Sequence, residues 1–428
     1  MREAPLTWQE CEQCQARFDE LDPVMLCRVC GGLLEAHHTP PALSASALRQ
    51  LFDGRLGAWA GGGPASGVWR FRELVLPGAA AESAVSYPEG NTPLVLSPIV
   101  GAWAGLDDLA LKHEGLNPTG SFKDRGMTVA LTQARRVGAR AVAGASTGNT
   151  SASLAAYAAL AGLPGFVLVP AGRVARGKLA QTVGYGAQVL AVRGDFDTCL
   201  QLLREHAEPL GLYLANSINP FRLEGQKSII FELLSQRNWK APDWIVLPGG
   251  NLGNTAAFGK ALEEARAAGL IERLPRLAVV QAAGAAPFAR SFAVGFEQRF
   301  QVEAETVATA IRIGNPASWG RAVRAIRATN GVVLNVSDGE ILEAKGVVDR
   351  AGIGCEPASA APVAGLRRLT DSGIVSAGQS AVVILTGHLL KDPEILLEGA
   401  PEKSIKELEA SPAAFAAAIE AGSRTILP

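Results

Sequence analysis

The stretch 117–126 reads Asn-Pro-Thr-Gly-Ser-Phe-Lys-Asp-Arg-Gly and joins a turn to a helix expected over residues 127–137. It presents Lys123 among small polar residues at the start of that helix. The helix N-terminus and the neighbouring Arg125 both oppose a second positive charge, so the neutral amine is favoured. Such a lysine is well placed to form a Schiff base with a carbonyl compound. The alternative is an ordinary surface lysine in the first turn of a helix.

The composition is that of a globular protein with more than one domain. The chain has 428 residues, 48% of them hydrophobic, with 40 basic and 41 acidic side chains. This length predicts two or three domains, and the near-neutral charge argues against polyanion binding by the whole surface. No segment has the length and apolarity of a membrane span, and the N-terminus lacks a signal pattern. We therefore expect a cytoplasmic protein with no nucleic-acid or membrane partner.

Short β-rich runs alternate with alanine-rich helical stretches from about residue 94 onward. Such alternation predicts parallel sheets with helices on both faces, here as two doubly wound open-sheet α/β domains. The expected strands are 109–112, 141–144, 165–169, 188–192, 244–247, 276–280, 332–336 and 381–386. The expected helices are 43–51, 151–160, 175–183, 196–206, 225–234, 255–268, 316–329, 338–352, 360–372, 403–410 and the tail from 411. A large domain of residues 37–130 and 240–428 would enclose a small domain of residues 131–239.

Four of the six cysteines form the motif C-x2-C-x12-C-x2-C, at Cys11, Cys14, Cys27 and Cys30. Two such thiolate hairpins close a tetrahedral zinc site, and four protein ligands make its role structural rather than catalytic. The glycines at 31 and 32 suit a tight knuckle beside the metal. Two disulfides or four free thiols are the alternatives, of which a cytosolic location disfavours the first. Residues 1–36 are thus expected to form a zinc-ribbon-like module.

A phosphate cradle is predicted where the strand 244–247 runs into a Gly/Asn turn and then a helix. Glycines let consecutive backbone N–H groups face inward, and the helix dipole adds partial positive charge. The turn lacks the Lys-Ser/Thr ending of a nucleotide P-loop and the G-x-G-x-x-G spacing of dinucleotide sites. The alternative is a plain strand-to-helix turn. The turn residues are Gly249, Gly250, Asn251, Leu252, Gly253 and Asn254.

Three further segments combine polar groups with strand or helix ends. The segment 145–151 offers hydroxyls, an amide and helix N–H groups that suit a carboxylate or a phenolate oxygen, although a generous N-cap has the same composition. Arg222 can bind a phosphate or a carboxylate through its planar guanidinium. Taken alone, the segment favours the alternative, a surface arginine paired with Glu224. Thr386 ends an apolar strand, where its hydroxyl would face a ring nitrogen or simply begin a turn.

Taken in order, these motifs resemble the threonine synthases, pyridoxal-phosphate enzymes of the tryptophan-synthase-β type (fold type II). The resemblance covers nearly the whole chain, and an N-terminal cysteine-pair module occurs in the same family. The motifs that carry it are Gly67-Val68-Trp69-Arg70-Phe71, Glu89-Gly90-Asn91-Thr92-Pro93-Leu94, the Ser-Phe-Lys-Asp-Arg-Gly run, Arg312-Ile313-Gly314-Asn315-Pro316, Glu356-Pro357-Ala358-Ser359-Ala360, Thr386-Gly387-His388 and Lys391-Asp392-Pro393.

The resemblance implies a cofactor, pyridoxal 5'-phosphate, and a role for each polar segment. Lys123 would hold the cofactor as a Schiff base, Asn149 would bond its phenolic oxygen, and Thr386 would face its pyridine nitrogen. The turn 249–254 would wrap its phosphate. The substrate carboxylate would lie on Ser146, Thr147 and Thr150. The substrate's own phosphate would lie in a second anion site formed by Asn216, Ser217 and Arg222.

The resemblance also implies a reaction, the conversion of O-phospho-L-homoserine and water to L-threonine and phosphate, in an enzyme expected to be a homodimer. A threonine dehydratase or a phosphoserine-using cysteate-type synthase of the same fold is the nearest alternative. The dehydratase needs no second phosphate site, which argues against it. Leu389 departs from the small glycine usual at that position and would narrow the space beside the ring. The rival from another class is a zinc-ribbon binding protein, whose knuckles here offer few basic residues.

Overall fold

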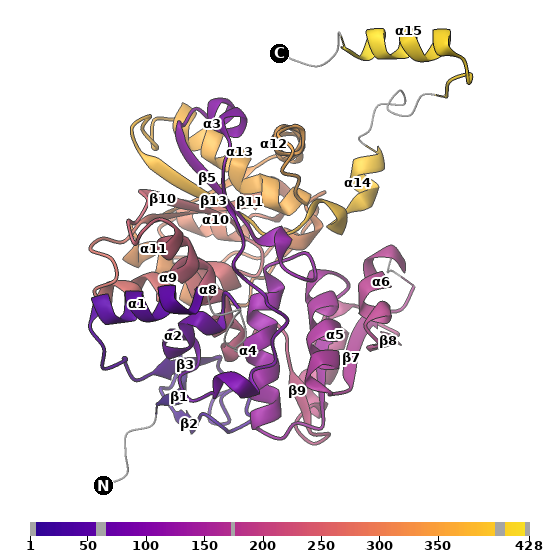
Figure 1. Ribbon diagram of the computed structural model, residues 1–428. Coiled ribbons are helices and arrows are strands. Elements are labelled where there is room, and N and C mark those ends of the chain that lie inside the picture. Colours follow the sequence, from indigo (N-terminus) through magenta and orange to yellow (C-terminus); the bar gives the residue numbers. More distant parts are fainter. Residues whose placement is uncertain (1–5, 57–65, 173–175, 399–406, 424–428) are drawn as a thin grey trace. The chain divides into compact units, whose positions relative to one another are not determined.

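A computed structural model describes residues 6–56, 66–172, 176–398 and 407–423 (Figure 1). The chain divides into two compact units, Met1–Lys391 and Asp392–Pro428, which are taken one at a time. The first unit contains three β-sheets. Among the described residues, no helix combines the length and the apolarity that crossing a membrane requires.

Six strands build the larger sheet, in the order β12-β11-β10-β13-β5-β4. All neighbours are parallel except β4, which runs antiparallel to β5 at one edge. The central strands are buried at nearly every position, as a sheet covered on both faces requires. The strands are β4 (Leu94–Leu96), β5 (Asp108–His113), β10 (Trp244–Pro248), β11 (Arg276–Ala282), β12 (Val332–Val336) and β13 (Ser380–Leu385).

Alternate residues of these strands belong to two different cores. On β10, Ile245 and Leu247 pack in one core, while Trp244 and Val246 pack in the other. Helices α8 (Pro220–Gln236), α9 (Gly253–Ala267) and α11 (Trp319–Ala328) supply the first core. Helices α3 (Pro98–Ala104), α12 (Asp338–Arg350) and α13 (Pro357–Asp371) supply the second. The period-two alternation therefore places helices on both faces of the sheet.

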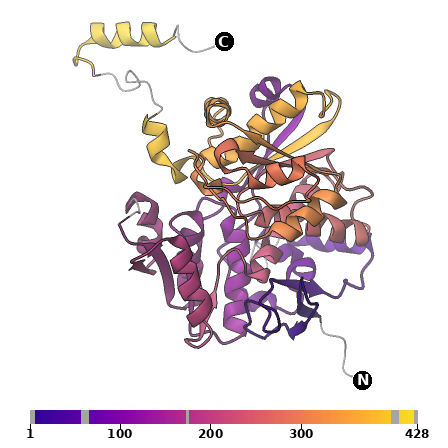
Figure 2. The ribbon, with the colours of Figure 1, turned by 180° about the vertical axis from the view of Figure 1, so that it is seen from behind.

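The smaller sheet has four parallel strands in the order β8-β7-β6-β9. Helices α4 and α5 pack on one face of it and α7 on the other, so this sheet is also doubly wound (Figure 2). Cys199 of α7 is fully buried in the second of these cores, as expected for an unpaired cysteine. The elements are β6 (Ala141–Ala145), β7 (Gly165–Pro170), β8 (Gln188–Val192), β9 (Leu212–Leu214), α4 (Lys123–Arg136), α5 (Asn149–Ala161), α6 (Arg176–Gly184) and α7 (Phe196–His206).

The third sheet is a small antiparallel one at the N-terminus, in the order β2-β1-β3. Its strands are β1 (Thr7–Cys11), β2 (Arg17–Asp19) and β3 (Leu34–His38). Buried charges hold it against the helices below the larger sheet. His38 Nε2 lies 2.7 Å from Glu224 Oε2 of α8, and Glu12 pairs with Arg321 of α11. Lys260 of α9 donates to the carbonyl oxygen of Ala36.

All eight expected strands are present, and most expected helices are within a few residues of their observed bounds. Helix α8 begins five residues before the expected start, because Asn219 caps it by accepting from the N–H groups of Phe221 and Arg222. The sequence reading missed the strands β1 to β4 and β9. It also missed the helices α2 (Arg72–Val75), α3, α10 (Pro287–Ala293) and α14 (Pro393–Glu398). The expected helix 43–51 is α1 (Ala45–Leu56).

The second unit contains α14 (Pro393–Glu398) and α15 (Pro412–Ser423). Helix α15 is the alanine-rich tail helix expected from residue 411, and residues 424–428 lie outside the described residues. The helix expected over 403–410 is wrong at 407–410, which are not helical, and its first four residues lie outside the described ones.

Candidate active site

Lys123 is the first residue of α4, and the loop before it is joined to the end of β13. The N–H of Phe122 donates to the carbonyl oxygen of Thr386 at 3.0 Å, and the N–H of His388 donates to that of Gly120 at 2.9 Å. Ser121 and Gly387 form an antiparallel bridge between these two bonds. The predicted lysine and the predicted ring-nitrogen partner are therefore neighbours, although they are far apart in sequence.

The environment of Lys123 lowers its pKa to about 7, first through burial away from water and then through the positive charge of Arg222. The carboxylate of Glu356 acts in the opposite direction. The neutral amine is thus accessible near neutral pH, as expected. The expected contribution of Arg125 was wrong, because Arg222 is the cation that lowers the pKa of Lys123.

Arg125 points away from Lys123 into a buried ion-pair network. Its Nε donates to Glu114 Oε2 at 2.6 Å and its Nη2 donates to Glu232 Oε1 at 2.8 Å. Lys112 donates to the same Glu232 oxygen at 2.5 Å. These residues are all fully buried. Since removal of one member leaves an uncompensated buried charge, the network fixes the first turn of α4.

Arg222 lies in the first turn of α8 and is 1% exposed. Its Nη1 donates to the carbonyl oxygen of Ala215 at 3.1 Å, whereas Nε and Nη2 have no hydrogen-bond partner among the described residues. Burial lowers its pKa to about 10, so it remains positively charged at neutral pH. Glu224, the alternative partner suggested by the sequence, pairs instead with His38, Lys227 and Lys260. Arg222 is consequently a buried cation with two donors available to an anion.

The Gly/Asn turn ends at the N-terminus of α9, as predicted. Leu252 precedes the helix in the left-handed conformation, with φ of 63°, and makes no side-chain cap. The first helical N–H groups are therefore available to an anion beside the positive end of the helix dipole. Asn254 Oδ1 and Thr255 Oγ1 are buried at the same end without a partner among the described residues. The Asn251 side chain is used within the protein, accepting from the N–H of Ala317 at 3.2 Å.

The two predicted ring contacts, Asn149 and Thr386, share a neighbour that the sequence reading did not assign. Asn149 is the first residue of α5, and its Nδ2 donates to Glu356 Oε2 at 2.9 Å. Thr386 Oγ1 lies 3.0 Å from Ser359 Oγ and 3.4 Å from Glu356 Oε1. Glu356 and Ser359 stand in a motif that was quoted for its resemblance alone, and the polar residues within it were the available signal.

The predicted carboxylate ligands Ser146, Thr147 and Thr150 are half-buried in the turn between β6 and α5. Ser146 Oγ accepts from the N–H of Gly148 at 3.2 Å. Gly148, the N-cap of α5, makes no side-chain cap, so the helix N–H groups remain available to an anion. These residues occupy the end of β6, next to Asn149.

The carboxamide of Asn216 is held by the backbone of Ala145. Its Oδ1 accepts from the Ala145 N–H at 3.1 Å, and its Nδ2 donates to the Ala145 carbonyl oxygen at 3.0 Å. Asn216 therefore ties the end of β6 to the segment before Arg222. Ser217 is half-buried in the same turn. Ser121 Oγ, which the sequence reading did not single out, is fully buried without a partner among the described residues.

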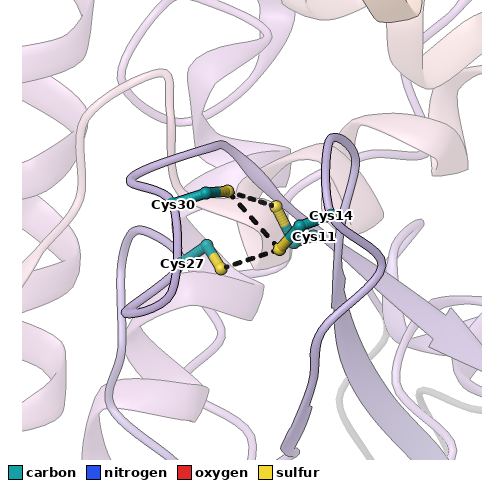
Figure 3. Close-up of side chains that lie close together, drawn as sticks. All are labelled: Cys11, Cys14, Cys27 and Cys30. Atoms are coloured by element: carbon teal, nitrogen blue, oxygen red, sulfur yellow. Dashed lines mark hydrogen bonds between the residues drawn. The ribbon is translucent and has the colours of Figure 1, made fainter.

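The four N-terminal cysteines converge at one point, as Figure 3 shows. Their sulfur atoms all lie within 4.8 Å of one another, with Cys11 to Cys30 at 3.4 Å and Cys14 to Cys27 at 3.5 Å. A tetrahedral site with Zn–S bonds of about 2.3 Å separates its sulfurs by about 3.8 Å. A Cβ at Gly32 would lie 2.9 Å from Cys11 Sγ, so the second knuckle needs glycine there.

Comparison with known proteins gives matches over most of the chain. Residues 85–387 match the family described as "Pyridoxal-phosphate dependent enzyme". The threonine synthase of Methanosarcina acetivorans is 43% identical over 92% of this chain and 95% of that protein. The threonine synthase of Mycobacterium leprae is 49% identical over 75% of this chain and 87% of that protein. The solved threonine synthase of Escherichia coli is 20% identical but has the same fold, with a TM-score of 0.67 over 98% of this chain and 95% of that one.

Proposed function

This chain belongs to the pyridoxal-phosphate dependent enzymes, among the threonine synthases, and we propose that the side chains around Lys123 carry out its reaction. The reaction is that of a lyase acting on a phosphate ester, which converts O-phospho-L-homoserine and water to L-threonine and phosphate. The proposals that follow concern the residues, their roles and the order in which protons move. The observation that carries them is the buried, partly unpartnered guanidinium of Arg222 beside the low-pKa amine of Lys123.

Pyridoxal phosphate fits the residues that converge here. Its aldehyde carbon needs a neutral amine, and Lys123 has a pKa of about 7. Its phosphate suits the uncapped start of α9, where Asn254 and Thr255 carry unpartnered polar atoms among the described residues. Its phenolic oxygen and ring nitrogen suit Asn149 and Thr386, whose side chains meet at one carboxylate. We propose that Gly249, Gly250, Asn251, Leu252 and Gly253 contribute backbone groups to the phosphate.

Arg222 supports a second phosphate site, distinct from the cofactor's. A buried guanidinium with two unmatched N–H groups is costly, and a doubly charged phosphate ester would satisfy both at once. Ser121 Oγ and Ser217 are the hydroxyl groups we assign to the same anion. We assign Asn216 to the site as well, but through the turn that it holds rather than through its carboxamide, which is bonded to Ala145.

When bound, the cofactor withdraws electrons from the substrate's Cα and Cβ, and the protein supplies position and proton transfer. Lys123 accepts the proton from Cα, for which its neutral amine is accessible near pH 7. Arg222 holds the phosphate as it departs from Cγ, because its charge stabilises the leaving dianion. A proton lost from Cβ to Lys123 supplies the electrons for that departure, and protonation of Cγ forms the methyl group. Water then adds its oxygen to Cβ, and Lys123 returns a proton to Cα to complete threonine. The helix N–H groups of α5, with Ser146, Thr147 and Thr150, hold the substrate carboxylate and so keep the carbon chain beside Lys123.

Two other enzymes of this fold would use most of the same residues. A threonine dehydratase has no substrate phosphate, so the unpartnered donors of Arg222 disfavour it. A phosphoserine-using synthase would keep that site, and only the relatives' identity disfavours it. Leu389 lies beside Gly354, where an added Cβ would be 3.3 Å from Leu389 Cβ.

We propose that Cys11, Cys14, Cys27 and Cys30 hold one structural zinc ion. The support is the mutual approach of the four sulfurs, together with backbone N–H groups of Gln13 and Val29 that donate to Cys11 and Cys27 Sγ at 3.4 Å. Four protein ligands leave no position for a substrate. A binding-only role for this module is the minor alternative.

We propose three domains, based on the boundaries expected from the sequence, and a homodimeric assembly. The three sheets support a division into three parts, 1–36, 37–130 with 240–391, and 131–239, because each sheet draws its strands from one of these parts. Two boundaries differ from the expectation: β3 crosses the one at residue 36, and α8 packs in a core of the larger sheet although it lies within 131–239. The assignment of residues 392–428 to the large domain rests on the sequence alone, because they form a compact unit of their own. No nucleic-acid partner is proposed.

The test is a comparison of three substrates on protein loaded with pyridoxal phosphate. O-Phosphohomoserine should yield threonine and one equivalent of phosphate, O-phosphoserine should be turned over at least a hundredfold more slowly, and threonine should yield no ketoacid. Lys123→Ala should abolish visible cofactor absorbance and turnover. Arg222→Lys should raise KM for the phosphate ester, while Arg273→Lys on the surface serves as control. Rapid turnover of O-phosphoserine, or protein that never takes up the cofactor, would contradict the proposal.

A further inference from the structure

We propose that Glu356 is a positioning residue for the cofactor, which acts by orienting the amide of Asn149. This inference rests on the proposed function, since it concerns the side chain assigned to the cofactor's phenolic oxygen. Glu356 stands in a motif that was quoted without a role for it, and the chemistry of the reaction does not by itself require a carboxylate at this point. Its place in the structure is what points to the role.

Glu356 stands immediately before α13, at the position where a side chain usually caps a helix. It makes no such cap, and the next residue is Pro357, which has no N–H to offer. The carboxylate instead extends across to α5, where Oε2 accepts from Asn149 Nδ2 at 2.9 Å. Oε1 lies 3.4 Å from Thr386 Oγ1. A single side chain that is 2% exposed thus touches both residues assigned to the ring.

Gly387 makes room for that carboxylate. A Cβ there would lie 2.4 Å from Glu356 Cδ, so a side chain at 387 would displace the carboxylate from its place. The N–H of Glu356 also donates to the carbonyl oxygen of Gly387 at 3.1 Å. Glu356 is therefore fixed at its backbone and packed at its carboxylate. Gly387 belongs to the same strand end that is bonded to the loop before Lys123, so this carboxylate is held in register with the reactive amine.

The bond to Glu356 decides which way the Asn149 amide faces. An ionised carboxylate only accepts hydrogen bonds, so it selects the Nδ2 side of the amide and rejects the Oδ1 side. Rotation of the amide by half a turn would set two acceptor oxygens against each other. With one Nδ2 hydrogen held by Glu356, the second hydrogen on the same nitrogen remains for a neighbouring oxygen. A phenolate oxygen there meets a donor instead of an acceptor, which stabilises its charged form.

The test uses the cofactor-loaded protein, with two measurements besides turnover. These are the dissociation constant for pyridoxal phosphate, from equilibrium dialysis, and the pH dependence of the bound cofactor's visible absorption. E356Q keeps an oxygen that can accept the same bond, so both measurements should stay near those of the parent protein. E356A removes the acceptor and should weaken cofactor binding by about tenfold, the effect of one hydrogen bond, and shift the absorption profile.

A double-substitution cycle separates positioning from a general effect on stability. If Glu356 acts through Asn149, then E356A added to N149A should cause no further loss of cofactor affinity. Glu343→Ala on α12 removes an exposed carboxylate and is the matched control. Should E356A fail to fold, E356D shortens the side chain by one methylene, and it should show the same weakening. Parent-like binding by E356A, additive losses in the cycle, or E356Q as defective as E356A would each overturn the inference. A parent protein that binds no pyridoxal phosphate would instead overturn the proposed function.

Discussion

The substitution Arg222→Met should make the protein more stable without phosphate and unresponsive to it. Burial lowers the pKa of Arg222 to about 10, where an arginine in water titrates at 12.5 or above. At 1.36 kcal/mol for each pKa unit, the charged form is less stable in the folded protein by about 3 kcal/mol. The charge of Arg222 therefore destabilises the fold at every pH below 10, because the guanidinium is charged in both the folded and the unfolded protein. Loss of the bond to Ala215 should cost about 1 kcal/mol.

The net gain is therefore about 2 kcal/mol. For 428 residues, at about 2.1 cal/mol/K of unfolding entropy per residue, this corresponds to a rise in Tm of about 2 °C. Inorganic phosphate at a hundred times its Kd should stabilise the parent protein by about 2.7 kcal/mol, or about 3 °C, and should not stabilise the variant. The assay is thermal unfolding of cofactor-loaded protein with and without phosphate, with Arg273→Met as the surface control. Loss of stability by Arg222→Met to the same extent in both buffers would refute the reasoning, since Arg222 would then be a purely structural residue.

Three further predictions concern other parts of the chain. The rate at which cofactor-free protein takes up pyridoxal phosphate should rise with pH and be half-maximal near pH 7, where Lys123 loses its proton. In Arg222→Met the midpoint should move to higher pH, because the positive charge that lowers the pKa of Lys123 is gone. An unchanged midpoint would show that Arg222 does not lower this pKa. Glu232→Gln should destabilise the fold by about 3 kcal/mol at pH 7. Against the opposing effect of burial, Arg125 and Lys112 lower the pKa of Glu232, so its ionised carboxylate stabilises the fold at neutral pH. This stabilisation is lost as pH falls through the folded-state pKa, and the difference in unfolding free energy between parent and variant should therefore narrow in acid. A difference that does not change with pH would contradict this. Cys27→Ser should remove the bound zinc measured by atomic absorption and lower Tm, whereas Cys199→Ser, which is equally buried but outside the cluster, should leave the zinc content unchanged.

The sequence predicted the parts of this protein that depend on local pattern. Each of the eight expected strands contains at least three consecutive apolar residues, and the turn before α9 has its glycines in one short segment, so both could be identified without tertiary information. The short strands β4 and β9 could not, because three residues carry no measurable periodicity and depend on pairing with a distant neighbour.

The motifs identified candidate residues of the site, but the sequence did not predict which of them contact one another. Arg125 stands two positions from Lys123, yet the helix turns it into the network of Glu114 and Glu232. Arg222 is distant in sequence and yet supplies the positive charge that Lys123 meets. Asn216 was expected to bind phosphate, but its carboxamide matches the backbone of Ala145 at both ends. These contacts depend on the direction of each side chain and on its neighbours in the fold, and the spacing of residues in the sequence determines neither.

The register between the loop before Lys123 and the end of β13 has a consequence for the protein during its synthesis. Strand β5 pairs with β13, the last strand of the sheet to leave the ribosome, and the N–H of Phe122 has its partner on Thr386. The N-terminal cysteine module and the smaller sheet are complete much earlier along the chain. A nascent chain therefore carries folded parts but no assembled cofactor pocket. Assembly of the pocket requires Thr386 and Gly387, so uptake of pyridoxal phosphate distinguishes chains that already include the end of β13 from those that do not.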